Sequence, residues 1–253
     1  MNNSKELPRA GPHFAAPPMW GAVGDPVEPL PADERAALAA HATVVRCRKG
    51  ESIFNAGEPA SDVFSIASGV VKLYRMRPGE GEHIARFMFP GDLMGLAEHG
   101  RYVNSAKSIT AAILYRMPVR ALEPRLRDSP GLEFRVITKL CHDLRRTQDH
   151  ALLMSKRRAS AKIGLFVQMI EADHGGSAAE DAELYLPMSR DDIAAYLGIS
   201  PEAVSRGFRG LVACGAVSFR DRHHLTIADR ARLEAVTAGP SRRHRSSSPA
   251  RQR

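Results

Sequence analysis

The stretch "MSRDDIAAYLGISPEAVSRGFRG", residues 188–210, contains two short helical patterns separated by Gly198. Ser189 is a suitable N-cap for the first helix, and two acids follow it where the helix dipole favours negative charge. Gly198 supplies the left-handed backbone that a tight turn needs. Ser200 then caps a second helix, whose first residue is a proline. The pattern predicts a helix-turn-helix over residues 190–209.

The second helix has an apolar face and a polar face. The apolar face holds Val204, Phe208 and Leu211, at the i, i+4, i+7 spacing of a buried stripe. The polar face holds Glu202, Ser205, Arg206 and Arg209. A polar face is often simply solvated, but the caps and the short turn make this one typical of a DNA-recognition helix.

These side chains suit contacts with DNA. Arginine binds guanine through two hydrogen bonds, glutamate accepts one from cytosine, and serine contacts either a base or a phosphate. We therefore predict that Glu202, Ser205 and Arg206 contact bases. Phosphate contacts are expected from Ser189, Arg190 and Arg209.

The segment "AVSFRDRHHLTIA", residues 216–228, indicates two strands around a polar turn, as in the wing of a winged helix. Arg220 in this turn is expected to contact a phosphate. His223 and His224 are interpreted as a solvated hairpin tip rather than a metal site, because further ligands are missing nearby.

The first half of the chain has a different pattern. Residues 42–116 contain short β-prone runs separated by turn signals, which favours a small antiparallel barrel or jelly roll. From about residue 130 the apolar spacing changes to that of one long amphipathic helix, with Phe134, Ile137, Cys141, Leu144 and Leu152 on one face. This helix either covers the barrel or forms a coiled-coil-like dimer seam, and its length favours the seam.

The expected fold class is thus α+β, in five segments. They are a disordered N-terminal tail (1–30), an antiparallel β-roll of the sensor type (31–128), a dimerisation helix (129–157), a winged helix-turn-helix domain (158–238) and a basic disordered tail (239–253).

Composition limits the function. The net charge of +8 hints at a polyanionic partner, although the last fourteen residues carry five of the arginines. The chain offers no run long and apolar enough for a membrane span and no signal-peptide pattern, so we expect a cytoplasmic protein. No nucleophile with an adjacent base, metal-ligand cluster or phosphate-binding loop is evident, which argues against an enzyme.

Residues 33–237 resemble the CRP/FNR superfamily of bacterial transcription regulators. The resemblance rests on "IFNAGEPASDVFSIASGVVKLYRM" (53–76), "FPGDLMGLAEHGRYVNSAKSIT" (89–110) and "LPMSRDDIAAYLGISPEAVSRGFRGL" (186–211). The FNR/FixK branch has a Glu-x-x-Ser-Arg pattern in its recognition helix, matched here by Glu202, Ser205 and Arg206. The resemblance implies a cyclic-nucleotide-binding-like roll and a homodimer that binds palindromes of the TTGAT-N4-ATCAA type. It also implies an activator that recruits RNA polymerase.

We expect no cofactor. Members of the superfamily that bind cyclic AMP hold the phosphate with an Arg-Ser pair and the ribose with a Glu, and here those positions are Asn104, Ser105 and Leu96. Members with an iron–sulfur cluster use four cysteines, three of them near the N-terminus, whereas this chain has only Cys47, Cys141 and Cys214. Haem ligation by His83 or His99 is disfavoured, because a solvated histidine is the commoner state.

Three alternatives stay open beside a FixK-like activator without an effector. One is a repressor with the same DNA contacts. Another is redox control through Cys214, whose basic surroundings would lower a thiol pKa, although a small buried packing residue is the favoured interpretation. A ligand-gated module that acts on another protein would lack the helix-turn-helix.

Overall fold

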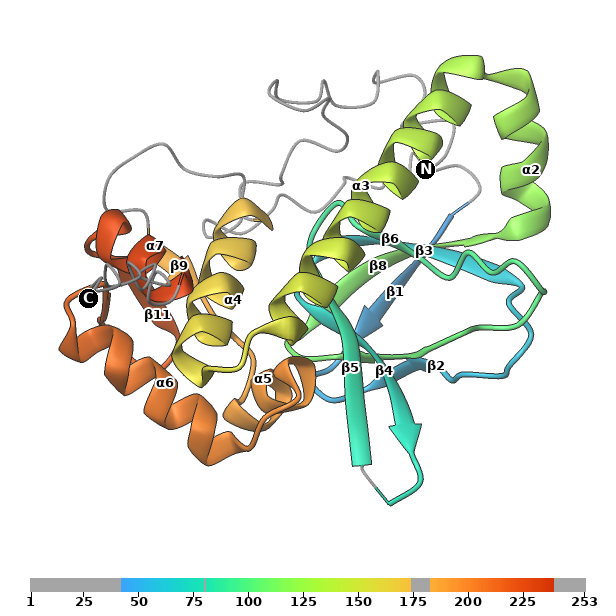
Figure 1. Ribbon diagram of the computed structural model, residues 1–253. Coiled ribbons are helices and arrows are strands. Elements are labelled where there is room, and N and C mark those ends of the chain that lie inside the picture. The colour runs from blue at the N-terminus through green and yellow to red at the C-terminus, as the bar shows by residue number, and fades with distance from the viewer. Residues whose placement is uncertain (1–41, 80, 174–182, 239–253) are drawn as a thin grey trace, which may run out of the picture.

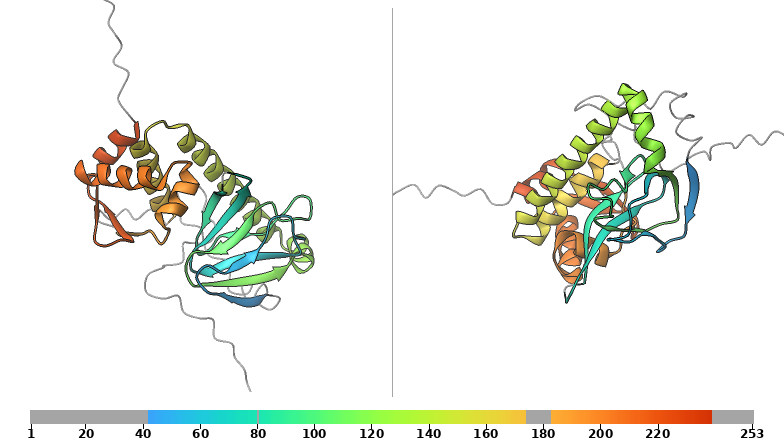
Figure 2. Two further views of the ribbon diagram at one scale, coloured as in Figure 1. Left: turned by 90° about the horizontal axis from the view of Figure 1, so that it is seen from below. Right: turned by 90° about the vertical axis from the view of Figure 1, so that its right-hand side faces the viewer.

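The computed structural model describes residues 42–79, 81–173 and 183–238. An N-terminal β-roll and a C-terminal group of helices are joined by one long helix, α3 (Pro130–Ser155), which crosses the roll (Figure 1). Figure 2 shows the two parts side by side. The predicted fold class is confirmed, while the two predicted tails, 1–30 and 239–253, lie outside the described residues.

The β-roll consists of two four-stranded antiparallel sheets, with strand orders β1-β8-β3-β6 and β2-β7-β4-β5. Strands far apart in sequence are therefore neighbours: β1 pairs with β8, and β2 with β7. The strands are β1 (Thr43–Cys47), β2 (Ser52–Phe54), β3 (Asp62–Ser68), β4 (Val71–Arg77), β5 (Gly81–Met88), β6 (Leu93–Met94), β7 (Ser105–Ser108) and β8 (Ala112–Pro118).

Aromatic and aliphatic side chains fill the space between the two sheets. The ring of Tyr102 stacks on Phe54 with centroids 4.0 Å apart, and Phe54 lies 5.5 Å from Phe64. The Tyr102 hydroxyl donates to the backbone oxygen of Asp62 at 2.9 Å. Because these side chains are buried with their polar atoms satisfied, the interior of the roll is a packed core.

Two helices follow the roll. The first, α2 (Val119–Asp128), ends at Ser129, whose hydroxyl accepts from the backbone N–H of Leu132 and so caps α3. The helix α3 has 26 residues, close to the length expected from its periodicity. Across the described residues, no helix combines the length and the apolar character that a membrane crossing needs.

Ion pairs attach one face of α3 to the roll. Arg86 of β5 contacts Asp143 of α3 at 2.8 Å and Asp92 at 3.5 Å, and Lys139 of α3 also pairs with Asp92. The opposite face is apolar and exposed. It presents Phe134, Ile137, Leu140, Leu144 and Leu152, each about half to two-thirds exposed in the single chain.

The described residues of the C-terminal part, 159–173 and 183–238, form four helices and a small sheet. The helices are α4 (Ala159–Asp173), α5 (Arg190–Leu197), α6 (Pro201–Ala213) and α7 (Arg230–Ala238). The sheet has the order β10-β11-β9, with strands β9 (Glu183–Tyr185), β10 (Val217–Phe219) and β11 (His224–Ile227). The two-strand wing expected from the sequence therefore gains a third strand, because β9 pairs with the free edge of β11.

Candidate nucleic-acid interface

Local hydrogen bonds define the helix-turn-helix. The Ser189 hydroxyl accepts from the backbone N–H of Asp192, and the Asp192 carboxylate accepts in return from the backbone N–H of Ser189, both at 3.0 Å. This capping box starts α5. Gly198 ends the helix with φ of 61°, and the Ser200 hydroxyl accepts from Ala203 N–H at 3.2 Å to start α6. The predicted turn thus forms at the expected residues.

The buried face of α6 packs closely on α4. Val204, Phe208 and Leu211 are buried, as predicted, and Gly207 lies between them. A Cβ at Gly207 would lie 2.8 Å from Cγ1 of Ile163, so a larger residue would push the helices apart. This contact fixes which side of α6 faces outward.

The predicted base-contacting residues lie together on the other side of α6. Glu202 and Arg206 are exposed, and Ser205 between them is half-buried. Hydrogen bonds from Ser200 and from its own backbone N–H, together with the nearby Arg206 charge, lower the pKa of Glu202. Arg206 makes no hydrogen bond or ion pair with another residue of the described part, and Glu202 is held as a carboxylate. The Arg206 guanidinium is thus available to a base edge, and the exposed Glu202 carboxylate keeps lone pairs that can accept a further hydrogen bond.

The predicted phosphate contacts differ in how free they are. Arg209 is exposed and has no ion-pair partner among the described residues. The Ser189 hydroxyl is already used, because it also donates to Asp192 Oδ2 at 2.7 Å. Arg190 is half-buried: its guanidinium carbon lies 4.1 Å from the ring centroid of Phe208 and 5.7 Å from that of Phe219. Burial, and then the charge of Arg222, lower the pKa of Arg190.

The wing hairpin changes two expectations. Arg220 contacts Glu183 of β9 at 3.0 Å, and Asp221 at 3.7 Å, so nearby acids partly neutralise its charge. The interpretation of His223 and His224 as a solvated tip is wrong. Both are half-buried, with His223 Nδ1 2.9 Å from the backbone oxygen of Leu186 and His224 Nδ1 2.8 Å from Asp221 Oδ2. The contact between Arg220 and Glu183 depends on strand β9, whose three residues give too short a signal to predict it.

Cys214 lies at the C-terminal end of α6, and it is exposed. Its thiol donates to the backbone oxygen of Leu211 at 3.3 Å, and its own backbone oxygen accepts from Arg232 at 3.0 Å. The favoured interpretation, a small buried residue between helix and wing, is therefore wrong. The residue is instead exposed at the surface of the single chain.

The roll does not fit a cyclic nucleotide. Ser105 is buried and its hydroxyl accepts from the backbone N–H of Ala56 at 3.0 Å, while the neutral Asn104 accepts from Arg75 at 3.0 Å. No arginine–serine pair is therefore available at this position to hold a phosphate, and packed rings occupy the interior. In the ranges that the structure covers, no three His, Cys, Asp or Glu side chains lie close enough together to hold a metal ion.

Two protein families match the two parts of the chain. The Crp-like helix-turn-helix domain matches residues 162–236, and the cyclic nucleotide-binding domain matches residues 44–129. The first match covers α4 to α7 with the wing, and the second covers the β-roll and α2.

Known proteins resemble the chain over most of its length. The nitrogen fixation regulation protein FixK of Bradyrhizobium diazoefficiens is 30% identical over 198 residues, covering 77% of this chain and 81% of FixK. The transcriptional activatory protein AadR of Rhodopseudomonas palustris is 33% identical over 187 residues, covering 72% of this chain and 75% of AadR. The solved structure of FixK2 from Bradyrhizobium japonicum has a TM-score of 0.71 at 27% identity, covering 79% of this chain and 99% of FixK2.

Proposed function

The chain belongs to the Crp/FNR family, and from this premise we propose that it is a sequence-specific DNA-binding transcription activator of the FixK type. The observation that carries the proposal is the outward face of α6, where Glu202, Ser205 and Arg206 lie together in the N-terminal half of a capped helix. Relatives such as FixK and AadR are named as regulators or activators. Because its proposed partner is DNA, we propose that the protein acts in the cytoplasm.

We propose a homodimer that binds two half-sites. The exposed apolar face of α3, from Phe134 to Leu152, has the spacing of a helix-pairing seam, and the ion pairs to the roll occupy the opposite face. Two recognition helices related by a two-fold axis enter successive major grooves about 34 Å apart. A palindrome of the TTGAT-N4-ATCAA type has this symmetry. Its guanine suits Arg206, and its cytosine suits Glu202.

Phosphate contacts in this proposal fix the dimer on its site. Arg209 is free for such a contact, and Arg190 is held by two rings close to the start of α5. Ser189 and Arg220 contribute less to phosphate binding, because the Ser189 hydroxyl already donates to Asp192 and Arg220 already pairs with Glu183. These contacts supply affinity that depends on salt but not on base sequence.

Activation requires that the bound dimer recruits RNA polymerase, which we propose as its protein partner. A repressor with the same DNA contacts is the competing function, and it differs only in where the site lies relative to the promoter. The filled interior of the roll supports an effector-free mode, in which the amount of protein sets activity. The exposed thiol of Cys214 supports a second means of control, by oxidation.

Selection of bound sites from random double-stranded DNA tests the proposal. The purified full-length protein is incubated with the library in reductant and, separately, in air. Enrichment of a palindrome with two TTGAT-like half-sites is the expected result in reductant. Enrichment of an unrelated or non-palindromic sequence overturns the proposed site, and no enrichment overturns sequence-specific binding altogether. Transcription from a promoter carrying the selected site then separates activation from repression.

A further inference from the structure

One buried ion pair joins the helix-turn-helix to the β-roll. Lys72, on β4, places its ammonium group 2.7 Å from Asp192 Oδ1 on α5 and 2.9 Å from Glu82 Oε2 on β5. The Lys72 side chain is 10% exposed and that of Asp192 is 16% exposed. The pair connects residues 120 positions apart, and it lies at the N-terminal end of α5, where Asp192 also contacts Ser189.

Asp192 uses its two oxygens for different partners. Oδ2 accepts from the backbone and hydroxyl of Ser189 and completes the capping box of α5, while Oδ1 accepts from Lys72. Burial opposes the charge on each partner, but the hydrogen bonds outweigh it, so the pKa of Lys72 is raised and that of Asp192 is lowered. Both groups are therefore charged near neutral pH. Losing one would leave the other charge buried and underpaired.

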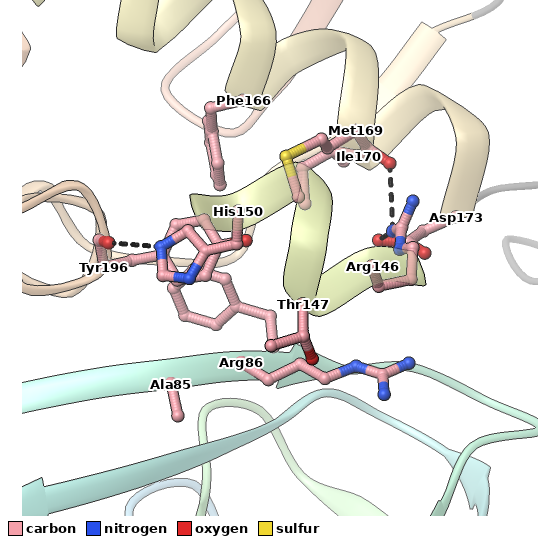
Figure 3. A pocket seen from close by; sticks show the side chains of 11 residues that line it. Ala85, Arg86, Arg146, Thr147, His150, Phe166, Met169, Ile170, Asp173 and Tyr196 are labelled. Atoms are coloured by element: carbon pink, nitrogen blue, oxygen red, sulfur yellow. Dashed lines mark hydrogen bonds and ion pairs between the residues drawn. The ribbon is translucent and has the colours of Figure 1, made fainter. Parts of the chain in front are cut away.

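The other end of α5 is fixed as well. His150 of α3 stacks on the Tyr196 ring with centroids 4.1 Å apart, and its Nε2 lies 2.9 Å from the Tyr196 backbone oxygen (Figure 3). Lys162 of α4 donates to the backbone oxygen of Leu197 at 2.8 Å. The Tyr196 ring also lies 5.1 Å from Phe87 of β5. The C-terminal half of α5 is thus held by α3, α4 and the roll, while its N-terminal end is held to the roll through Lys72.

We propose that Lys72 is a positioning residue for DNA recognition: by holding Asp192, it docks α5 on the β-roll and fixes the direction in which α6 presents its outward face. The turn at Gly198 is short, and α6 packs on α5 and α4, so a tilt of α5 moves the recognition helix with it. In a dimer the spacing between the two recognition helices must match the spacing of the two half-sites. A small tilt of α6 therefore weakens binding to the palindrome. The roll thereby aligns the DNA-binding part without a small molecule.

The test replaces Lys72 by Met, which keeps much of the side-chain length and removes the charge. Lys107→Met is the matched control. Lys107 is the neighbour of Lys72 in register on β7, and its side chain makes no ion pair with another described residue. Lys72→Arg, which keeps the charge, serves as the rescue variant. Sedimentation and thermal unfolding establish that each variant is folded with the oligomeric state of the parent protein.

Hydrogen–deuterium exchange of the full-length protein without DNA is the first arm. We expect faster exchange over residues 190–213 in Lys72→Met than in Lys107→Met, with Lys72→Arg close to the parent. The same exchange in all variants overturns the proposal. This arm needs no DNA, so it stands even if the proposed binding site is wrong.

Affinity for DNA is the second arm, and it rests on the proposed function. We expect Lys72→Met to bind the selected palindrome at least tenfold more weakly than the parent protein does, with unchanged affinity for random duplex. The variant changes how the recognition helices fit the two half-sites, but it leaves the basic residues that contact phosphates in place. Equal loss on both DNAs indicates general destabilisation and overturns the positioning role. The double variant Lys72→Met/Asp192→Asn tests whether Lys72 acts through Asp192. If the double variant binds the palindrome more weakly than the weaker-binding single variant does, Lys72 does not act through Asp192 alone. If the parent protein itself prefers no palindrome, the proposed function is wrong. The hydrogen–deuterium exchange experiment then remains the test of whether Lys72 holds α5 on the roll.

Discussion

The guanidinium carbon of Arg190 lies 4.1 Å from the ring centroid of Phe208, so a residue expected at the DNA backbone also packs inside the helix-turn-helix. Phe208 belongs to the buried face of α6, and the ring centroid of Phe219 on β10 lies 5.7 Å from the same guanidinium carbon and 5.5 Å from that of Phe208. The stack therefore joins the start of α5, the recognition helix and the wing. Its two roles are separable by experiment.

Arg190→Ala is predicted to reduce both stability and DNA affinity. Loss of the cation–π contact and of the packed side-chain stem lowers the free energy of unfolding by about 1 kcal/mol. Urea unfolding measures this loss. Arg209→Ala is the matched control, because Arg209 is exposed without a ring contact in the described structure. It should weaken binding to all duplexes while leaving unfolding unchanged, and equal unfolding midpoints for the two variants contradict the stacking role.

Arg206→Ala is predicted to lose base discrimination. Its side chain is exposed in the N-terminal half of α6, and a bidentate contact with guanine accounts for ~1 to 3 kcal/mol of discrimination. Fluorescence anisotropy with the palindrome, and with each substituted half-site, measures the effect. The variant should bind all bases at the guanine position similarly. A variant that still prefers guanine assigns the contact to another residue.

Leu144→Glu is predicted to break the dimer. Leu144 is 60% exposed at the centre of the apolar face of α3, where a dimer would bury it and a buried unpaired carboxylate is costly. Analytical ultracentrifugation should show half the parent mass. Val103→Glu places the same charge at an exposed apolar residue of the roll, 54% exposed, and should leave the mass unchanged. If the Leu144→Glu variant is still a dimer, the dimer interface does not include this face of α3.

Stability is predicted to fall in mild acid because of His142 on α3. Burial, together with the charges of Lys139 and Arg146, lowers the pKa of His142 from 6.5 to about 4. The unfolded chain then takes up a proton before the folded one does, so this contribution is fully present above about pH 6.5 and is lost as the pH falls towards 4. At pH 5 the loss is on the order of 1 to 2 kcal/mol, allowing for the part of the ring that is exposed.

Urea unfolding at pH 7.5 and pH 5 checks this contribution. His142→Gln lacks the titrating ring, so the difference between the two pH values should shrink relative to the parent. His150, whose pKa is also lowered by burial, supplies a remaining difference. An unchanged difference in His142→Gln shows that other groups cause the acid sensitivity.

Peroxide is predicted to weaken DNA binding if Cys214 is a redox switch. The thiol is exposed at the end of α6, and its oxidation adds polar atoms beside Leu211 and the wing. Binding to the palindrome is measured before and after peroxide, with Cys214→Ser as the comparison. Protection in the serine variant supports the switch, and equal loss in both proteins rules it out. Cys141→Ser controls for the other exposed thiol.

The local parts of the site were predictable from the sequence. The caps at Ser189 and Ser200, the turn at Gly198 and the two faces of α6 depend on residues within a few positions of one another. The exposed face of α3 followed from spacing for the same reason. The packed roll was predictable only as a class, because its strands pair across up to about seventy residues, as β1 does with β8.

Contacts that depend on tertiary structure were not predictable. The sequence placed Asp192 at a helix start, but nothing in it indicated that Lys72 lies against the same carboxylate. Glu183 neutralises Arg220 only because the short strand β9 adds to the wing. In both cases an acid meets a base from a distant element, and periodicity carries no information about such pairs.

The close approach of Gly207 to Ile163 shows that the two sides of α6 have different roles. One side of α6 is committed to packing, while Glu202, Ser205 and Arg206 on the other side carry none of the hydrophobic core. A library varied at these three positions alone should therefore yield proteins of nearly constant fold and different target sequences. If the proposed base contacts are right, the fold and the target sequence of this protein can be changed independently of each other.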